Sequence, residues 1–346
     1  MPRRVIWGVL VAFLLGCSAP AKPGASPSSA SAPREVEGRA SPGSEPAPMP
    51  VAGASDAKGA KGAPLDAAAR LSLADARRYM VTLINRDRAT MGLSPVELDL
   101  GAPTKAGQAH AEDMAAHGYL GHWGTDGSVP EQRLTEAGGS DMVLENALCF
   151  IDEAARTLDA APTLDPREIV RAEDMFFNEK PPNDGHRRNI LKAAHRRVGI
   201  GVAQPIKTKS EIPVPCFAQE FTDPYGTYAA VPSKLKLGAT LHVEGDVHAP
   251  AAVGGVGLAR VASPHALPVA EVNRRRSYPV PTPYQVYWPK GFKTPIPVAV
   301  TGEHFAIDLP VNDNNQPGLY ELSIWAKMPG SPEFVMIGLR TIRVDR

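Results

Sequence analysis

The chain has 346 residues, which is enough for about two ordinary domains. Its 37 lysine and arginine residues balance 37 aspartate and glutamate residues, and its basic runs are short. No global field therefore favours nucleic acid or an acidic surface, and we expect no nucleic-acid partner.

The first residues are typical of a bacterial export signal. Arg3 and Arg4 supply positive charge, and an apolar run from 5 to 15 follows. Because a membrane span needs about 20 residues, this run is too short to cross a bilayer. It ends in Leu-Leu-Gly-Cys, which resembles a lipobox, so we predict a signal peptide at 1–17 and lipidation at Cys17. The alternative is an ordinary signal peptide that contains a cysteine.

Residues 18–69 form a segment of low complexity. They are mainly alanine, proline, serine and glycine with scattered charge and no periodic apolar pattern. Such a segment buries too little apolar surface to offset the entropy lost on ordering. We predict a disordered tether that holds the folded part away from the membrane.

The segment 70–228 mixes predicted helices and strands. Ser72, followed by Asp75, forms a capping box, and helical apolar spacing then continues to a stop near Gly92. Further helices are expected at 102–117, 130–137, 165–178 and 184–195, the last capped by Asp184, with strands at 143–150, 197–203 and 213–221. Short strands among helices predict an α+β domain in which an antiparallel sheet is covered by helices.

The texture changes in 231–346, where helical periodicity disappears. Strands are expected at 235–243, 268–272, 280–288, 296–301, 305–309, 320–326 and 334–344. About seven strands at this spacing predict an immunoglobulin-like β-sandwich. The glycine-rich run 254–257 lacks the strand–helix setting of a dinucleotide loop and is interpreted as a β-turn or flexible loop.

Three aromatic residues in this part form a candidate carbohydrate platform. They are Tyr284, Tyr287 and Trp288. Aromatic residues in strands are more often core or cross-strand partners, so we favour that reading.

Two cysteines remain after the predicted signal peptide, namely Cys149 and Cys216. In an oxidising compartment two leftover cysteines favour a disulfide over a metal pair. The alternative is two buried thiols, since both lie in apolar, strand-like sequence.

Two histidines and two glutamates, each in a distinctive frame, are the main candidates for chemistry. They are His122, Glu145, Glu179 and His186. Neutral imidazole ligates zinc or another borderline divalent metal, and carboxylates can complete such a site. A histidine with a glutamate can instead act as a general base, for which Glu145 and Glu179 are the catalytic candidates. A structural hydrogen-bond network is the third reading, and no nucleophile is apparent.

Two other histidines are weaker candidates. His110 and His117 lie seven residues apart on one predicted helical face. We favour a core role for His110 and hydrogen bonds to helix-end carbonyls for His117.

The frames resemble a known family. The stretches are Gly118-Tyr119-Leu120-Gly121-His122, Glu145-Asn146, Phe176-Phe177-Asn178-Glu179, Gly185-His186-Arg187-Arg188-Asn189-Ile190-Leu191 and Val198-Gly199-Ile200-Gly201. In this order they are similar to signatures of bacterial members of the CAP/SCP superfamily (cysteine-rich secretory protein, antigen 5, pathogenesis-related 1). The resemblance implies an α-β-α sandwich over 70–228, a cleft lined by the four candidate residues, and lipid or sterol-like ligands.

We therefore expect an exported protein, lipid-anchored at the bacterial cell envelope or secreted. Its expected activity is binding of an envelope ligand, a lipid by resemblance, or a divalent metal such as zinc in the histidine–glutamate cleft. One alternative is a metal-dependent hydrolase that uses Glu145 or Glu179 as base. The other is a structural or adhesion protein that acts through the β-sandwich.

Overall fold

The computed structural model describes residues 69–206, 214–275 and 277–346. These residues all fall within one compact unit, 63–346. The predicted signal peptide with Cys17, and the predicted tether except for its last residue, lie outside the described residues.

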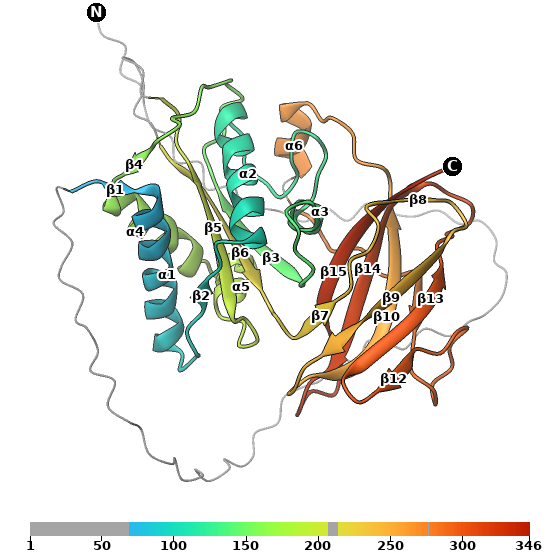
Figure 1. Cartoon of the computed structure of the whole chain (residues 1–346). Coiled ribbons are helices and arrows are strands. Elements are labelled where there is room, and N and C mark those ends of the chain that lie inside the picture. Colours follow the sequence, from blue (N-terminus) through green and yellow to red (C-terminus); the bar gives the residue numbers. More distant parts are fainter. Residues whose placement is uncertain (1–68, 207–213, 276) are drawn as a thin grey trace, which may run out of the picture. The chain divides into compact units, whose positions relative to one another are not determined.

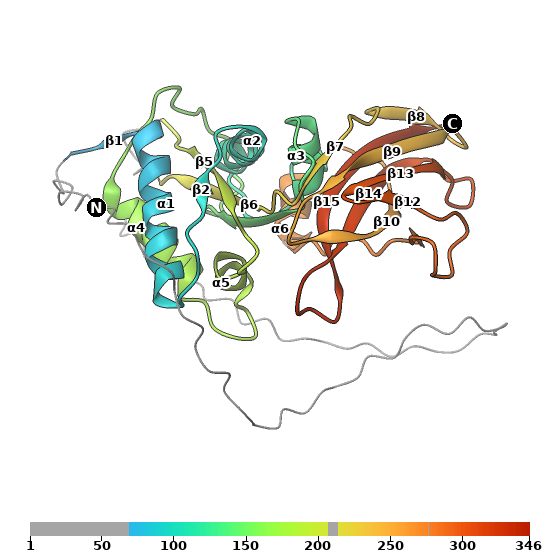
Figure 2. The ribbon, with the colours of Figure 1, turned by 60° about the horizontal axis from the view of Figure 1, so that its bottom comes forward.

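The first half is an α-β-α sandwich around a four-stranded sheet (Figure 1). The strands in spatial order are β2 (Glu97–Leu98), β5 (Arg197–Ala203), β6 (Cys216–Thr222) and β3 (Val143–Leu148). The helices are α1 (Leu73–Thr90), α2 (Ala102–His117), α3 (Pro130–Glu136), α4 (Pro166–Phe177) and α5 (Gly185–Ile190), and a two-residue ladder joins β1 (Leu71–Ser72) to β4 (Thr163–Leu164). Helix α2 covers one face of the sheet, and α1 and α4 cover the other (Figures 1 and 2). This arrangement confirms the predicted α-β-α fold, although the sheet is not wholly antiparallel, because β2 runs parallel to β5.

Helix α1 begins at the predicted capping box. The Ser72 hydroxyl accepts a hydrogen bond from the Asp75 backbone N–H at 3.2 Å. The helix then buries an apolar stripe that includes Met80 and Ile84, both without solvent exposure, against the core formed with α4 and the sheet. The helix therefore owes its start to the cap and its position to this stripe.

Glycines in β5 determine how closely α2 approaches the sheet. A Cβ atom on Gly201 would lie 2.0 Å from the carbonyl oxygen of Gly107 in α2, and one on Gly199 would lie 2.2 Å from the carbonyl carbon of Pro103. Because the strand alternates, Val198, Ile200 and Val202 (none more than 1% exposed) join the core on the opposite face. The Val-Gly-Ile-Gly pattern thus packs a helix backbone on one face and aliphatic side chains on the other.

A disulfide joins Cys149 to Cys216, as predicted. Cys149 follows the end of β3, and Cys216 is the first residue of β6, its antiparallel neighbour. The two Cα atoms are 4.4 Å apart. The bond therefore fastens the edge strand β3 to the centre of the sheet.

The second half is a two-sheet β-sandwich. One sheet has the order β11 (Gln285–Tyr287), β10 (Ala252–Val261), β14 (Gly318–Lys327), β15 (Phe334–Asp345) and β8 (Lys234–Lys236), and the other has the order β12 (Ala299–Thr301), β13 (His304–Pro310), β9 (Thr240–Val247) and β7 (Gly226–Tyr228). Their facing sides share one apolar core that includes Val243, Phe305 and Ile324, all fully buried. Tyr287 is buried in this core, so it does not share an exposed platform with Tyr284 and Trp288.

Two predictions in the sandwich were wrong. The glycine-rich run at 254–257 lies inside β10, where a Cβ on Gly255 would meet the Tyr287 carbonyl oxygen at 2.7 Å. Glycine is required there by the close neighbouring strand and does not mark a turn. The segment expected as a strand at 268–272 belongs to helix α6 (Val269–Arg275), in which Glu271 pairs with Arg275 at 2.8 Å.

The helix predicted at 184–195 is shorter than expected. It spans Gly185–Ile190, and the Asp184 side chain makes no capping hydrogen bond. The buried Arg88 guanidinium donates hydrogen bonds to the carbonyl oxygens of Ile190 and Lys192, at 2.6 and 3.0 Å, and the helix does not continue past this point. The guanidinium thus bonds carbonyl groups at the C-terminal end of the helix that would otherwise need a further helical turn as partner.

Among the described residues, no helix has both the length and the apolar character that a membrane span requires.

Candidate functional site

The four predicted residues come together at the free edge of β3. Glu145 lies within β3, and His122 lies in the loop that leaves α2 after Gly118, whose φ of +66° ends that helix. Glu179 follows α4, and His186 is the second residue of α5. They form two histidine–glutamate pairs, which together are called the cleft below.

The first pair is anchored from behind by an arginine. His122 Nδ1 lies 2.8 Å from Glu145 Oε1, while Glu145 Oε2 accepts a hydrogen bond from Arg133 Nη2 at 2.7 Å. Arg133 also donates to the His122 carbonyl oxygen at 3.1 Å. Burial opposes ionisation of Glu145, but neighbouring cationic groups, Arg133 among them, and the His122 hydrogen bond hold its pKa well below the ordinary value. Glu145 is therefore a buried carboxylate, fixed at both oxygens.

The second pair is held by the turn between α4 and α5. His186 Nδ1 lies 2.7 Å from Glu179 Oε1, and the His186 backbone N–H donates to Glu179 Oε2 at 2.9 Å. Burial raises the pKa of Glu179, but the hydrogen bonds from His186 outweigh it and the net pKa is lowered. The Phe176 ring lies edge-on to the imidazole, 5.0 Å between centroids. Glu179 and Phe176 together fix the orientation of His186.

The two imidazole rings face the same space. Their centroids are 6.3 Å apart at an interplanar angle of 60°, and the His122 and His186 side chains are 24% and 27% exposed. A carboxylate can only accept, so each Nδ1 carries a proton, and the neutral form of each ring presents an unprotonated Nε2. The cleft thus offers two solvent-accessible nitrogen bases whose orientation is set from behind.

The carboxylates support the imidazoles and do not converge with them on one point. Among the described residues, no three His, Cys, Asp or Glu side chains are grouped so as to hold a metal ion. A tetrahedral zinc ion bound by both histidines, with Zn–N bonds of about 2.0–2.1 Å, would hold the two ring centres about 5 Å apart. The observed separation is 6.3 Å, so one ion could be shared only if the two rings moved about 1 Å closer together.

An amide network holds α5 against β3. Asn146 donates to the Gln219 side-chain oxygen at 2.9 Å and to the His186 carbonyl oxygen at 3.2 Å. Asn189 donates to the Asn146 side-chain oxygen at 2.9 Å and to the Glu145 carbonyl oxygen at 3.3 Å. These bonds link the edge strand that carries Glu145 to the helix that carries His186.

Three residues around Glu145 were not assigned a role at the site from the sequence. They are Arg133, Glu220 and His110. Glu220 is opposite Glu145 in the ladder and fully buried, and burial together with the Glu145 charge raises its pKa well above normal. His110 Nε2 lies 3.6 Å from Glu145 Oε1. A sequence signal existed, since Gln219 and Glu220 interrupt an otherwise apolar strand and so require buried partners.

His110 and His117 have the structural roles that the sequence favoured, a core position and a bond to a helix carbonyl. His110 is 1% exposed, and its Nε2 bonds the Gly121 carbonyl oxygen at 2.8 Å. Burial first, then the Arg133 charge, lower the pKa of His110 to about 4. His117 Nδ1 lies 3.0 Å from the Asp113 carbonyl oxygen, one turn earlier in α2. His110 is thus a buried neighbour of Glu145, and His117 bonds within its own helix.

Comparison with known protein families gives a match within the first half. Residues 81–209 match the model of the CAP family, described as the cysteine-rich secretory protein family. No curated protein matches the sequence.

Two solved structures show weak similarity. A chitin binding domain from Burkholderia pseudomallei is 11% identical over 33% of this chain and 57% of its own, with a TM-score of 0.22. A chimeric titin Z1Z2 carrying a KLER peptide from decorin is 15% identical over 35% of this chain and 93% of its own, with a TM-score of 0.17. This chain thus spans little more than half of the first structure, and at these scores neither likeness supports a conclusion.

Proposed function

We propose that this protein, whose residues 81–209 match the model of the cysteine-rich secretory protein (CAP) family, binds an extracytoplasmic ligand through the cleft, with a divalent metal such as zinc as its first occupant. The observation that carries the proposal is the pair of accessible imidazoles at 6.3 Å, each backed by a carboxylate. Carboxylates behind histidines fix the tautomer and raise the basicity of the outward nitrogen, which is how outer-shell residues support metal ligands.

In this proposal His122 and His186 hold the metal, while Glu145 and Glu179 orient them. A metal bound by two imidazoles keeps further coordination positions, which an anionic or carbonyl oxygen of a ligand can fill. A lipid or another envelope molecule with such a headgroup is the class of ligand that we propose.

Export is part of the proposal. A structural disulfide such as that between Cys149 and Cys216 is typical of oxidising compartments. Together with the signal sequence and lipobox-like Cys17, it supports a protein that is lipid-anchored at the bacterial cell envelope.

A hydrolase that uses Glu145 as base is less well supported. Both carboxylate oxygens are engaged by His122 and Arg133, and the lowered pKa makes the group a weak base. No observation favours adhesion through the β-sandwich over the other two functions.

The proposal is tested by thermal unfolding of the untagged chain with and without zinc. A ligand present at about 100 times its Kd stabilises the native state by about 2.7 kcal/mol, so Tm should rise. The shift should disappear when His122→Ala and His186→Ala are combined. It should persist in His304→Ala, a matched surface histidine that is half-exposed in the sandwich. An unchanged Tm with zinc, or an equal shift in the double variant, would refute metal binding in the cleft.

A further inference from the structure

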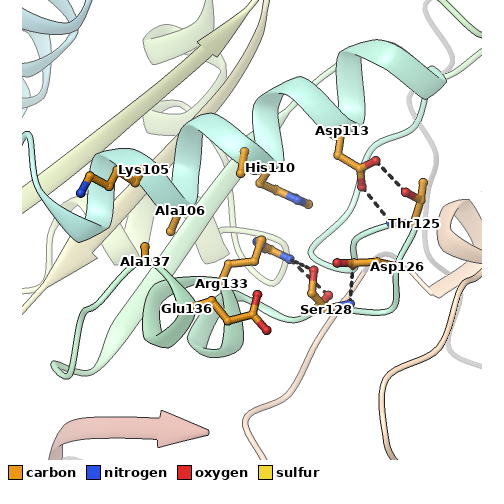
Figure 3. Close-up of a pocket in the computed structure, with 11 residues that line it drawn as sticks. Lys105, Ala106, His110, Asp113, Thr125, Asp126, Ser128, Arg133, Glu136 and Ala137 are labelled. Carbon is orange, nitrogen blue, oxygen red and sulfur yellow. Dashed lines mark hydrogen bonds between the residues drawn. The ribbon is translucent and has the colours of Figure 1, made fainter. Parts of the chain in front are cut away.

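A second cavity lies behind the cleft. It measures about 370 Å³ and lies between α2, α3 and the loop around residues 125–128, partly open to solvent (Figure 3). Arg133 and His110 line it. The same two residues contact Glu145, Arg133 at 2.7 Å and His110 at 3.6 Å. One layer of side chains therefore separates this cavity from the cleft.

Small side chains leave the cavity open. Ala106 and Ala109 on α2 and Ala137 after α3 line it. Alanine cannot fill the space between the two helices, so a short apolar chain fits between them. Ala109 is exposed, which makes it a position where a larger side chain can be introduced without disturbing the core.

Negative charge predominates around the space. Asp113, Asp126 and Glu136 line it, and Figure 3 shows the Lys105 ammonium directed away from the other lining side chains. The Arg133 charge is already balanced by Glu145 at 2.7 Å. The unbalanced charge that a ligand would meet is therefore that of carboxylates.

Two residues of the cavity wall have a buried polar atom without a hydrogen-bond partner among the described residues, Arg133 at its Nε donor and His110 at Nδ1. His110 Nε2 lies 2.8 Å from a carbonyl oxygen, which can only accept, so Nε2 carries the proton and Nδ1 is the unprotonated nitrogen. Among the described residues Nδ1 has no hydrogen-bond partner, although the side chain is fully buried. A buried acceptor without a donor is costly, and an N–H group from a ligand would satisfy it.

We infer that this cavity is a binding site for a small organic cation, a primary ammonium or guanidinium group on a short apolar chain. The carboxylates match the charge, the alanines accommodate the chain, and His110 Nδ1 accepts from an N–H group. This inference does not depend on metal binding in the cleft.

The test uses the full chain and isothermal titration with n-butylamine and agmatine, which are cationic at neutral pH. Neutral n-butanol and anionic butyrate, of matched size, are the control ligands. Saturable binding of both cations, with no binding of the controls, is expected. Absence of saturable binding of either cation, or equal binding of n-butanol, overturns the inference.

Variants locate the binding. Ala109→Leu should abolish it by filling the space, and Asp126→Asn combined with Glu136→Gln should weaken it about tenfold or more. Glu97→Gln, an exposed carboxylate elsewhere in the same half, should have no effect. Binding that survives Ala109→Leu overturns the inference. The His122→Ala and His186→Ala double variant should bind the amines normally, which separates this result from the zinc test.

Discussion

Glu145 is the residue on which the geometry of the cleft depends most. It orients His122 through one oxygen, accepts from Arg133 through the other, and lies beside two further ionisable groups, His110 and Glu220. Burial alone would favour its protonated form. Arg133 supplies the compensating charge, so the arginine is as necessary to the arrangement of the cleft as His122.

Replacing Arg133 with methionine should destabilise the protein strongly. The change leaves Glu145 buried without its ionic partner, and such a loss costs about 3–5 kcal/mol. Urea unfolding at neutral pH measures the change in the free energy of unfolding.

Combining Arg133→Met with Glu145→Gln should recover part of that loss, because no unpaired charge then remains. An additive effect of the two changes would contradict the assigned pairing.

At this scale the sequence predicted the residues of the cleft but not their partners. His122, Glu145, Glu179 and His186 stand in distinctive local frames, and the frames carry the resemblance. Arg133 becomes a partner of Glu145 only because α3 packs beside β3, 12 residues away in the chain. Contacts of this kind depend on tertiary packing, which local patterns do not specify.

At the scale of the element, glycine permits close backbone contacts at two places in the molecule. In β5 it lets the backbone of α2 rest on the sheet, and in β10 it lets neighbouring strands and aromatic side chains approach. Both runs contain Val-Gly or Gly-Val steps. The β5 run was predicted as a strand because apolar residues alternate with its glycines. The run at 254–257 has fewer side chains to reveal a period of two and was interpreted as a turn.

The α6 prediction failed for a related reason. The short run at 268–272 is apolar enough for a strand, and its helical character depends on pairs beyond its end, where Arg274 and Arg275 contact Glu271. Short apolar segments are ambiguous between helix and strand. Long periodic segments such as α1 and α2 were predicted correctly because several turns repeat the same pattern.

Gly201→Ala should separate α2 from the sheet. The added Cβ would lie 2.0 Å from one backbone atom and 2.2 Å from another, so the helix must move. We expect a loss near the upper end of ~1–3 kcal/mol in the free energy of unfolding.

The matched control is Gly185→Ala, where no atom lies within 4 Å of the added Cβ and φ is not positive. That change should be neutral or stabilise by about 0.4–1 kcal/mol. Equal losses for the two variants in urea unfolding would refute the close-approach explanation.

At the scale of the whole molecule, the helical half and the β-sandwich share a buried acid pair. Glu131 of α3 and Glu321 of β14 are 2% and 0% exposed. The Tyr278 hydroxyl oxygen hydrogen-bonds to Glu131 and lies 3.2 Å from Glu321 Oε1. The phenol has one proton to give, so a second proton, on a carboxyl group, is needed to hold the cluster together. Nearby backbone bonds, such as Met142 N–H to the Ile337 carbonyl oxygen at 3.0 Å, continue the same contact.

This cluster predicts a loss of stability at alkaline pH. Burial, then the Glu131 charge, raise the pKa of Glu321 to about 9, against about 4.5 for an ordinary glutamate. Below about 4.5 both folded and unfolded chains hold the proton, so the stabilisation is complete. Between about 4.5 and 9 only the folded chain keeps it, and stability falls as pH rises, by at most about 1.4 kcal/mol per pH unit for one proton.

Glu321→Gln should remove this dependence, because its amide donates a hydrogen bond to Glu131 without titrating. The free energy of unfolding of the parent chain and of the variant is measured in urea at intervals from pH 6 to 9.5. As pH rises, the parent chain should lose stability relative to the variant. Glu333→Gln, an exposed glutamate of the same half, is the matched control and should follow the parent chain. A constant gap between the parent chain and Glu321→Gln would mean that the two carboxyl groups do not share a proton across this contact.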